Sequence, residues 1–188
     1  MAMHDDSAQS YGIEHHKHRF AAWAACRAAS VVNCRFSVAQ GRTVLEASGF
    51  TASFYRPEQL PNPEPIAVDD THREWRNAVV REAETRGLSF THGVAAKLVN
   101  IYLKSRFVCG GYHEHPRVQG LHPPIDSVLL RRLAAENVGG HEREWKQAAK
   151  TRWSKFDSGD YERVIVLIRH ASGVQPLWKI EWHWSGNQ

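Results

Sequence analysis

Residues 93–97 read Gly93-Val94-Ala95-Ala96-Lys97, and they open an apolar run of helical periodicity that extends to about Phe107. Further along, residues 123–130 read Pro123-Pro124-Ile125-Asp126-Ser127-Val128-Leu129-Leu130 and open a second amphipathic helix. The first segment places an amine in the first turn of a helix, and the second places a carboxylate at an N-cap position. The rest of the predicted architecture is arranged around these two helix starts.

The flanking segments also carry helical signals. Further helices are predicted at residues 18–29, 37–49 and 70–87, before the first segment. Asp157 is the expected cap of a later helix. The tail differs, because residues 178–184 alternate apolar and polar side chains, a pattern that predicts a strand. The fold class is therefore mainly α, a compact helical domain with a short β addition at the C-terminus.

Length and composition indicate one globular domain. The chain has 188 residues, 42% hydrophobic and 23% charged, and none of its apolar stretches approaches the roughly 20 residues that span a bilayer, so no membrane partner is expected. We divide it into a polar leader, residues 1–16, and a single helical domain, residues 17–188, with the hairpin and the following helix at about 89–136. The acidic start lacks the features of a secretory signal, which predicts a cytoplasmic protein.

The cysteines and the net charge exclude only a few classes of site. Cys26, Cys34 and Cys109 are odd in number and show no C-x-x-C spacing, which argues against a disulfide framework and against a cysteine-built zinc or iron–sulfur site. We expect reduced thiols and no cofactor. The net charge of +4 permits contact with a polyanion but does not identify one.

The glycine–lysine turn has two interpretations. A glycine before a helix lets backbone N–H groups converge into an anion site that suits a DNA phosphate. Lys97 follows Gly93 by one turn, near the positive end of the helix and beside Val94 and Leu98. Both surroundings lower the pKa of an amine, and a lysine of lowered pKa is a usable nucleophile. The alternative is a solvated surface lysine, the commoner role at such a position.

Asp126 is equally ambiguous when taken alone. Its simplest role is to accept N–H bonds as the N-cap of the helix that follows Pro123 and Pro124. The same bonds hold a carboxylate ionised and oriented, as is needed to stabilise a cationic sugar transition state or to take a proton from an amine.

Taken together, the two segments resemble the helix-hairpin-helix DNA glycosylases, in particular the 8-oxoguanine glycosylase branch. In that family the hairpin reads Gly-Val-Gly-x-Lys and the later segment Pro-Val-Asp-x-x-Val, where this chain has Gly93-Val94-Ala95-Ala96-Lys97 and Pro124-Ile125-Asp126-Ser127-Val128. The resemblance covers residues 89–133. Ala95 stands at the second hairpin glycine, and the loop before Asp126 is longer than is usual in the family.

The resemblance implies a DNA repair enzyme that excises an oxidised purine such as 8-oxoguanine, with or without AP-lyase activity. Lys97 would attack the anomeric carbon and form a Schiff base, and Asp126 would activate the amine. Backbone amides of Gly93, Val94 and Ala95 would bind the DNA backbone while the damaged nucleotide is turned out of the duplex. Aromatic side chains in the C-terminal third are candidates for the base pocket: Trp153, Phe156, Trp178, Trp182 and Trp184.

Other classes of protein stay open. The residues His113, Glu114, His115 and His122 offer zinc-type ligands for a metal-dependent hydrolase, although we favour a solvated loop and no metal, because an extended segment points His113 and His115 apart. A non-catalytic helix-hairpin-helix protein would bind DNA with salt-dependent affinity and release no base, which fits Ala95 and the long loop. A non-enzymatic interaction protein is the last alternative.

Overall fold

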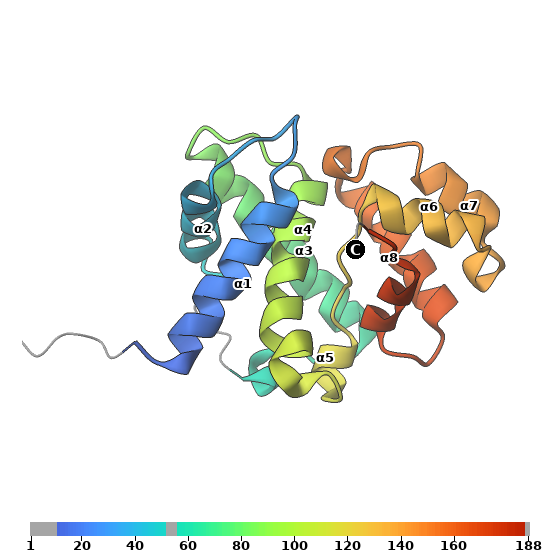
Figure 1. Cartoon of the computed structure of the whole chain (residues 1–188), viewed down its shortest axis with the longest axis horizontal. Coiled ribbons are helices and arrows are strands. Elements are labelled where there is room, and N and C mark those ends of the chain that lie inside the picture. Colours follow the sequence, from blue (N-terminus) through green and yellow to red (C-terminus); the bar gives the residue numbers. More distant parts are fainter. Residues whose placement is uncertain (1–10, 52–55, 187–188) are drawn as a thin grey trace, which may run out of the picture.

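The structure, a computed structural model, describes residues 11–51 and 56–186 and is mainly helical (Figure 1). Its α-helices are, in chain order, α1 (Ile13–Ala29), α2 (Val38–Ala47), α3 (Pro65–Glu84), α4 (His92–Leu103), α5 (Pro116–Gln119), α6 (Ser127–Ala135), α7 (Glu142–Ala148) and α8 (Ser158–Ser172). They are joined by the 3-10 segments η1 (Pro57–Gln59), η3 (Val138–Gly140), η4 (Trp153–Lys155) and η5 (Leu177–His183), and by the π-helix η2 (Lys104–Tyr112). Within the described ranges there is no strand, only an isolated bridge between Val31 and Cys34.

The capping residues position several helices as the sequence predicts. Ser37 and Asp157 each form a capping box, at the starts of α2 and α8. Asp126 accepts backbone N–H bonds at the start of α6. Gly87, just beyond α3, has a φ of +70°, the left-handed conformation that glycine adopts readily and that ends many helices.

Two helices begin earlier than predicted. The helix α3 starts at Pro65 rather than near residue 70, because proline fits the first helical position, where the missing N–H costs nothing. The helix α1 starts at Ile13, so residues 13–16 of the predicted leader are helical. Residues 1–10 of that leader lie outside the described residues.

The strand predicted for residues 178–184 is wrong. Leu177 and Ile180 are buried three residues apart, which is the repeat of a 3-10 helix, and they turn η5 toward the second hydrophobic cluster described below. Trp182 stays 90% exposed. The alternating tryptophans therefore do not form one buried face. The burial of Leu177 and Ile180 favours the 3-10 helix over a strand.

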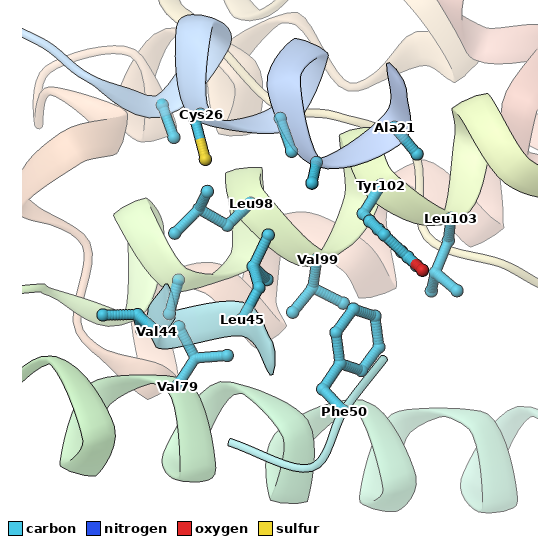
Figure 2. Close-up of a cluster of buried hydrophobic side chains, with 14 of the residues drawn as sticks. Ala21, Cys26, Val44, Leu45, Phe50, Val79, Leu98, Val99, Tyr102 and Leu103 are labelled. Carbon is cyan, nitrogen blue, oxygen red and sulfur yellow. The ribbon is translucent and has the colours of Figure 1, made fainter. Parts of the chain in front are cut away.

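The core consists of two hydrophobic clusters that meet at α4. The first cluster joins α4 to α1, α2 and α3, and Figure 2 shows Leu98, Val99 and Tyr102 of α4 lying between these helices. The second cluster is built mainly from α6, α7, α8 and η5, around Leu129 and Trp145, and Ala96 of α4 belongs to it. Figure 1 shows α4 between the two groups of helices.

Burial on all sides changes the expected character of α4. Every residue from Gly93 to Asn100 is buried, so this helix is buried on all sides rather than along one apolar face. Lys97 therefore lies in the interior, at the junction of the two clusters. No helix in the described part of the chain is both long and apolar enough to cross a bilayer.

Candidate functional site

Lys97 of α4 and Asp126 at the start of α6 form a buried ion pair. The Lys97 Nζ atom lies 3.0 Å from Asp126 Oδ2 and 3.3 Å from the carbonyl oxygen of Ile125. The Lys97 side chain is 7% exposed and that of Asp126 is 19% exposed. The fold thus brings together the amine and the carboxylate that the sequence singles out, from positions 29 residues apart.

The two oxygens of Asp126 have separate partners. Oδ1 accepts the backbone N–H groups of Val128, at 3.0 Å, and Leu129, at 2.9 Å, and so caps α6. Oδ2 accepts from Lys97 Nζ and from Trp184 Nε1, each at 3.0 Å. The cap and the contact with the amine are therefore properties of one fixed carboxylate rather than competing roles.

Burial and pairing shift both ionisable groups. Burial lowers the pKa of the Lys97 amine below the ordinary lysine value, and Asp126 offsets this effect only in part. Burial alone would raise the pKa of Asp126, but Lys97, the N–H of Leu129 and Trp184 together hold it below its usual value. An amine that loses its proton more readily thus faces a carboxylate that stays ionised.

A small cavity lies beside the amine. It has no room for a water molecule, and its lining includes Lys97, Trp153, Phe156 and Tyr161. The centroid of a Trp153 ring is 5.4 Å from Lys97 Nζ, within the range of a cation–π contact. Pockets that enclose drug-sized ligands measure about 300–1,000 Å³, so the side chains around Lys97 are packed too closely for a nucleotide to enter this space.

The base-pocket candidates divide into two groups. Trp153 and Phe156 line the cavity, and Trp184 donates to Asp126. Trp178 instead lies edge-on to His113, with ring centroids 6.1 Å apart, and Trp182 projects from the surface. Only the first group is placed where it could contact a substrate held at Lys97.

The backbone amides predicted to bind DNA phosphate are engaged inside the protein. The N–H of Gly93 donates to the carbonyl of Phe156, and those of Val94 and Ala95 donate to Thr91 Oγ1 and the Thr91 carbonyl. A Cβ atom at position 93 would lie 1.8 Å from the carbonyl oxygen of Trp153. Gly93 therefore permits close packing of α4 against η4.

The histidine-rich loop does not gather its side chains into one site. His115 caps the short helix α5 and lies 3.7 Å from Glu58 Oε1, while exposed His113 faces Trp178. His122 is buried elsewhere, bonded to Asp69. Neither Glu114 with these histidines nor any other group of three or more His, Cys, Asp or Glu residues among the described positions is arranged to hold a metal ion. The proposed ligand set of a metal-dependent hydrolase is therefore dispersed.

The chain matches no protein-family model, no curated protein and no solved structure. The interpretation of the site therefore depends on its own geometry.

A buried polar network behind the cavity was not predicted. Asn100, one turn beyond Lys97, donates to Tyr161 Oη at 3.0 Å, and its Oδ1 lies 2.7 Å from His72 Nε2. His122 lies between Tyr161 Oη, at 3.1 Å, and Asp69 Oδ1, at 2.8 Å. The only signal in the sequence is a polar residue, Asn100, inside an apolar run. Because Asn100 and Tyr161 also line the cavity, the network supports its inner wall.

A second ion pair flanks the first. Glu181 of η5 pairs with Lys104, at the start of η2. Burial raises the pKa of Glu181, with Lys104 and Lys97 acting in the opposite direction. This pair fastens η5 beside the Lys97–Asp126 pair, and Trp184 follows directly after η5.

The buried histidines predict a loss of stability on acidification. Burial lowers the pKa of His72 well below 6.5, the ordinary value of an unfolded-chain histidine, and lowers that of His122 as well. Below pH 6.5 the unfolded chain therefore binds protons that the folded protein does not, and the free energy of unfolding falls, by up to about 1.4 kcal/mol per pH unit for each histidine. Asp69, whose pKa is about 2, adds its own loss only in more acidic solution. Urea unfolding at about pH 7.5 and about pH 5 measures the difference.

A His72→Gln variant tests the origin of this slope. Glutamine keeps a donor for Asn100 but does not titrate, so its stability is expected to depend less on pH than that of the wild type. His113→Gln, at an exposed histidine, is the matched control and should leave the slope unchanged. A wild-type slope in His72→Gln would assign the pH dependence to other groups.

Proposed function

We propose that this protein is a lysine-dependent DNA glycosylase of the helix-hairpin-helix type, which excises an oxidised purine through a Schiff-base intermediate. The observation that carries the proposal is the buried Lys97 amine, 3.0 Å from a carboxylate that a helix cap holds in place. In this proposal the hairpin and the following helix lie at about residues 89–136, and DNA is the partner. Strand cleavage at the resulting abasic site is a second step that the same intermediate allows.

In the proposed chemistry Asp126 acts on a proton and Lys97 forms a bond. Asp126 Oδ2 accepts a proton from the Lys97 amine, and the nitrogen then bonds to the anomeric carbon of the extruded nucleotide. The bond from that carbon to the base breaks, and the base leaves with the electron pair and takes up a proton. Opening of the sugar ring gives the Schiff base, which borohydride reduces to a stable secondary amine.

The direct test is incubation with oligonucleotides that carry different base lesions, in the presence of borohydride. A covalent protein–DNA adduct at Lys97 is the expected result, and the lesion that gives it identifies the substrate. Salt-dependent DNA binding without an adduct or base release would favour the non-catalytic alternative. If no lesion gives either DNA binding or an adduct, the Lys97–Asp126 pair is purely structural and the proposal is overturned.

Asp126→Asn is expected to lower the rate of trapping about 10²-fold or more, because an amide cannot accept the amine proton. Asparagine is as good an N-cap as aspartate, so α6 should persist. Lys97 and Trp184 each lose an acceptor, at a cost of about 1–3 kcal/mol in the free energy of unfolding. Single-turnover trapping and urea unfolding measure the two effects separately.

The matched control is Asp157→Asn. This aspartate also caps a helix, α8, but its side chain accepts from the backbone N–H of Asp160 rather than from a lysine. Its trapping rate should equal that of the wild type. Trapping by Asp126→Asn within a factor of about two of the wild type would remove the proton-accepting role of Asp126.

A further inference from the structure

Trp184 shares its hydrogen-bond acceptor with the Lys97 amine. Its indole Nε1 donates to Asp126 Oδ2, the same oxygen that accepts from Lys97. The Lys97 side chain is only 7% exposed, whereas the Trp184 residue is 41% exposed, so Trp184 is the more exposed of the two donors to Asp126 Oδ2. A sugar carbon can reach the buried amine only if side chains near it move.

Ion pairs anchor the segment that carries Trp184 through residues that precede the tryptophan. Upstream, Glu181 pairs with Lys104, and His183 pairs with Glu136 of the turn after α6. Downstream, buried Gly186 packs on the indole itself, because a Cβ atom there would lie 2.0 Å from Trp184 Cζ2. Among the described residues, the chain beyond Trp184 packs on the ring rather than pairing with a charged group of another helix. The anchors of η5 are thus made by side chains other than Trp184.

We infer that Trp184 is a positioning residue for Asp126 and a displaceable cover of Lys97, which the extruded nucleotide pushes aside. While the site is closed, the indole N–H holds Oδ2 toward the amine; when the indole leaves, Oδ2 is free to accept the proton that Lys97 gives up. The inference rests on the proposed function for the reactive Lys97 amine and for the nucleotide that displaces Trp184; the cover and the positioning role are tested without DNA.

Three variants separate the cover from the hydrogen bond. Trp184→Ala removes both, and Trp184→Phe keeps an aromatic ring but removes the N–H. Gly186→Val keeps Trp184 but displaces its ring. The probe is glycolaldehyde with cyanoborohydride, which labels a reactive amine without DNA, and peptide mass spectrometry follows Lys97. We expect labelling about tenfold faster in Trp184→Ala and Gly186→Val, and close to the wild-type rate in Trp184→Phe.

The hydrogen bond has its own readout, an NMR titration of the Asp126 carboxyl carbon. Loss of the indole donor should raise the pKa of Asp126 in both Trp184 variants. The other charged groups that act on this carboxylate are Lys97 of α4 and, through the second ion pair, Lys104 and Glu181, and all three are unchanged in these variants. A purely structural tryptophan would not shift the titration in Trp184→Phe.

The matched control is Trp182→Ala, because Trp182 is 90% exposed in the same segment, and it should change neither labelling nor titration. Wild-type labelling in Trp184→Ala would overturn the cover, and an unmoved Asp126 titration in Trp184→Phe would overturn the positioning role. Circular dichroism at the labelling temperature verifies that each variant is folded. Since neither assay contains DNA, a failure to trap any lesion would contradict the proposed function and leave this inference standing.

Discussion

Replacing Lys97 by glutamine will abolish borohydride trapping on every oligonucleotide that the wild type captures, while the affinity for DNA changes little. Lys97 supplies the only nitrogen that the proposed Schiff base contains, so the loss is complete rather than partial. Its side chain is 7% exposed, so it contributes little to the surface that DNA would contact. Denaturing gel electrophoresis measures the adduct, and fluorescence anisotropy measures binding.

A second substitution guards against simple loss of fold. Removing one partner of a buried ion pair costs about 3–5 kcal/mol, so Lys97→Gln alone could act by unfolding the protein. Lys97→Arg keeps a cation beside Asp126 but cannot form a Schiff base, and it should be equally inactive in trapping. Lys150→Gln, at an exposed lysine following α7, is the matched control and should trap as the wild type does. Adduct formation in folded Lys97→Arg would refute the nucleophile assignment.

Gly93→Ala will destabilise the protein by about 3 kcal/mol, a large effect for one methyl group. The new Cβ would lie 1.8 Å from the Trp153 carbonyl oxygen, and that atom belongs to backbone that cannot rotate away. The helix α4 and η4 must separate, which also moves Trp153 and Phe156 away from Lys97. Urea unfolding measures the stability, and trapping of the variant below its unfolding midpoint should be reduced as well.

Gly110→Ala is the matched control for this prediction. A Cβ atom at Gly110 would meet its nearest neighbour, the Ser105 carbonyl oxygen, at 3.8 Å, which is ordinary contact. Its stability should stay within about 1 kcal/mol of the wild type. Equal stabilities of Gly93→Ala and Gly110→Ala would show that α4 and η4 tolerate separation and that Gly93 is not a packing constraint.

Local rules account for much of the fold. Ser37, Asp126 and Asp157 begin helices where the sequence predicts, because a side-chain oxygen that satisfies helix N–H groups is a property of a few adjacent residues. The meeting of Lys97 with Asp126 was expected from the order of segments in a known family rather than from periodicity. Patterns of neighbouring residues could not have placed two groups 29 residues apart within 3.0 Å.

The features that the sequence did not reveal depend on long-range packing. The tail forms η5 because Leu177 and Ile180 pack against apolar side chains of other helices. The alternation of tryptophans in the sequence does not indicate these long-range contacts. The backbone N–H of Gly93 donates to the carbonyl oxygen of Phe156, 63 residues away in the sequence. The contacts of His72, Asn100 and Tyr161 likewise join three different helices, α3, α4 and α8.

The two oxygens of the Asp126 carboxylate bind different partners, which bears on proton transfer at this site. Oδ1 remains committed to the first turn of α6 whether Oδ2 carries a proton or not. In the proposed mechanism a proton can therefore arrive at Oδ2 and depart again while Oδ1 stays directed at the first turn of α6, and no rotation of the side chain has to accompany the transfer. One residue would then serve as both helix cap and acid–base group, with a separate oxygen for each role.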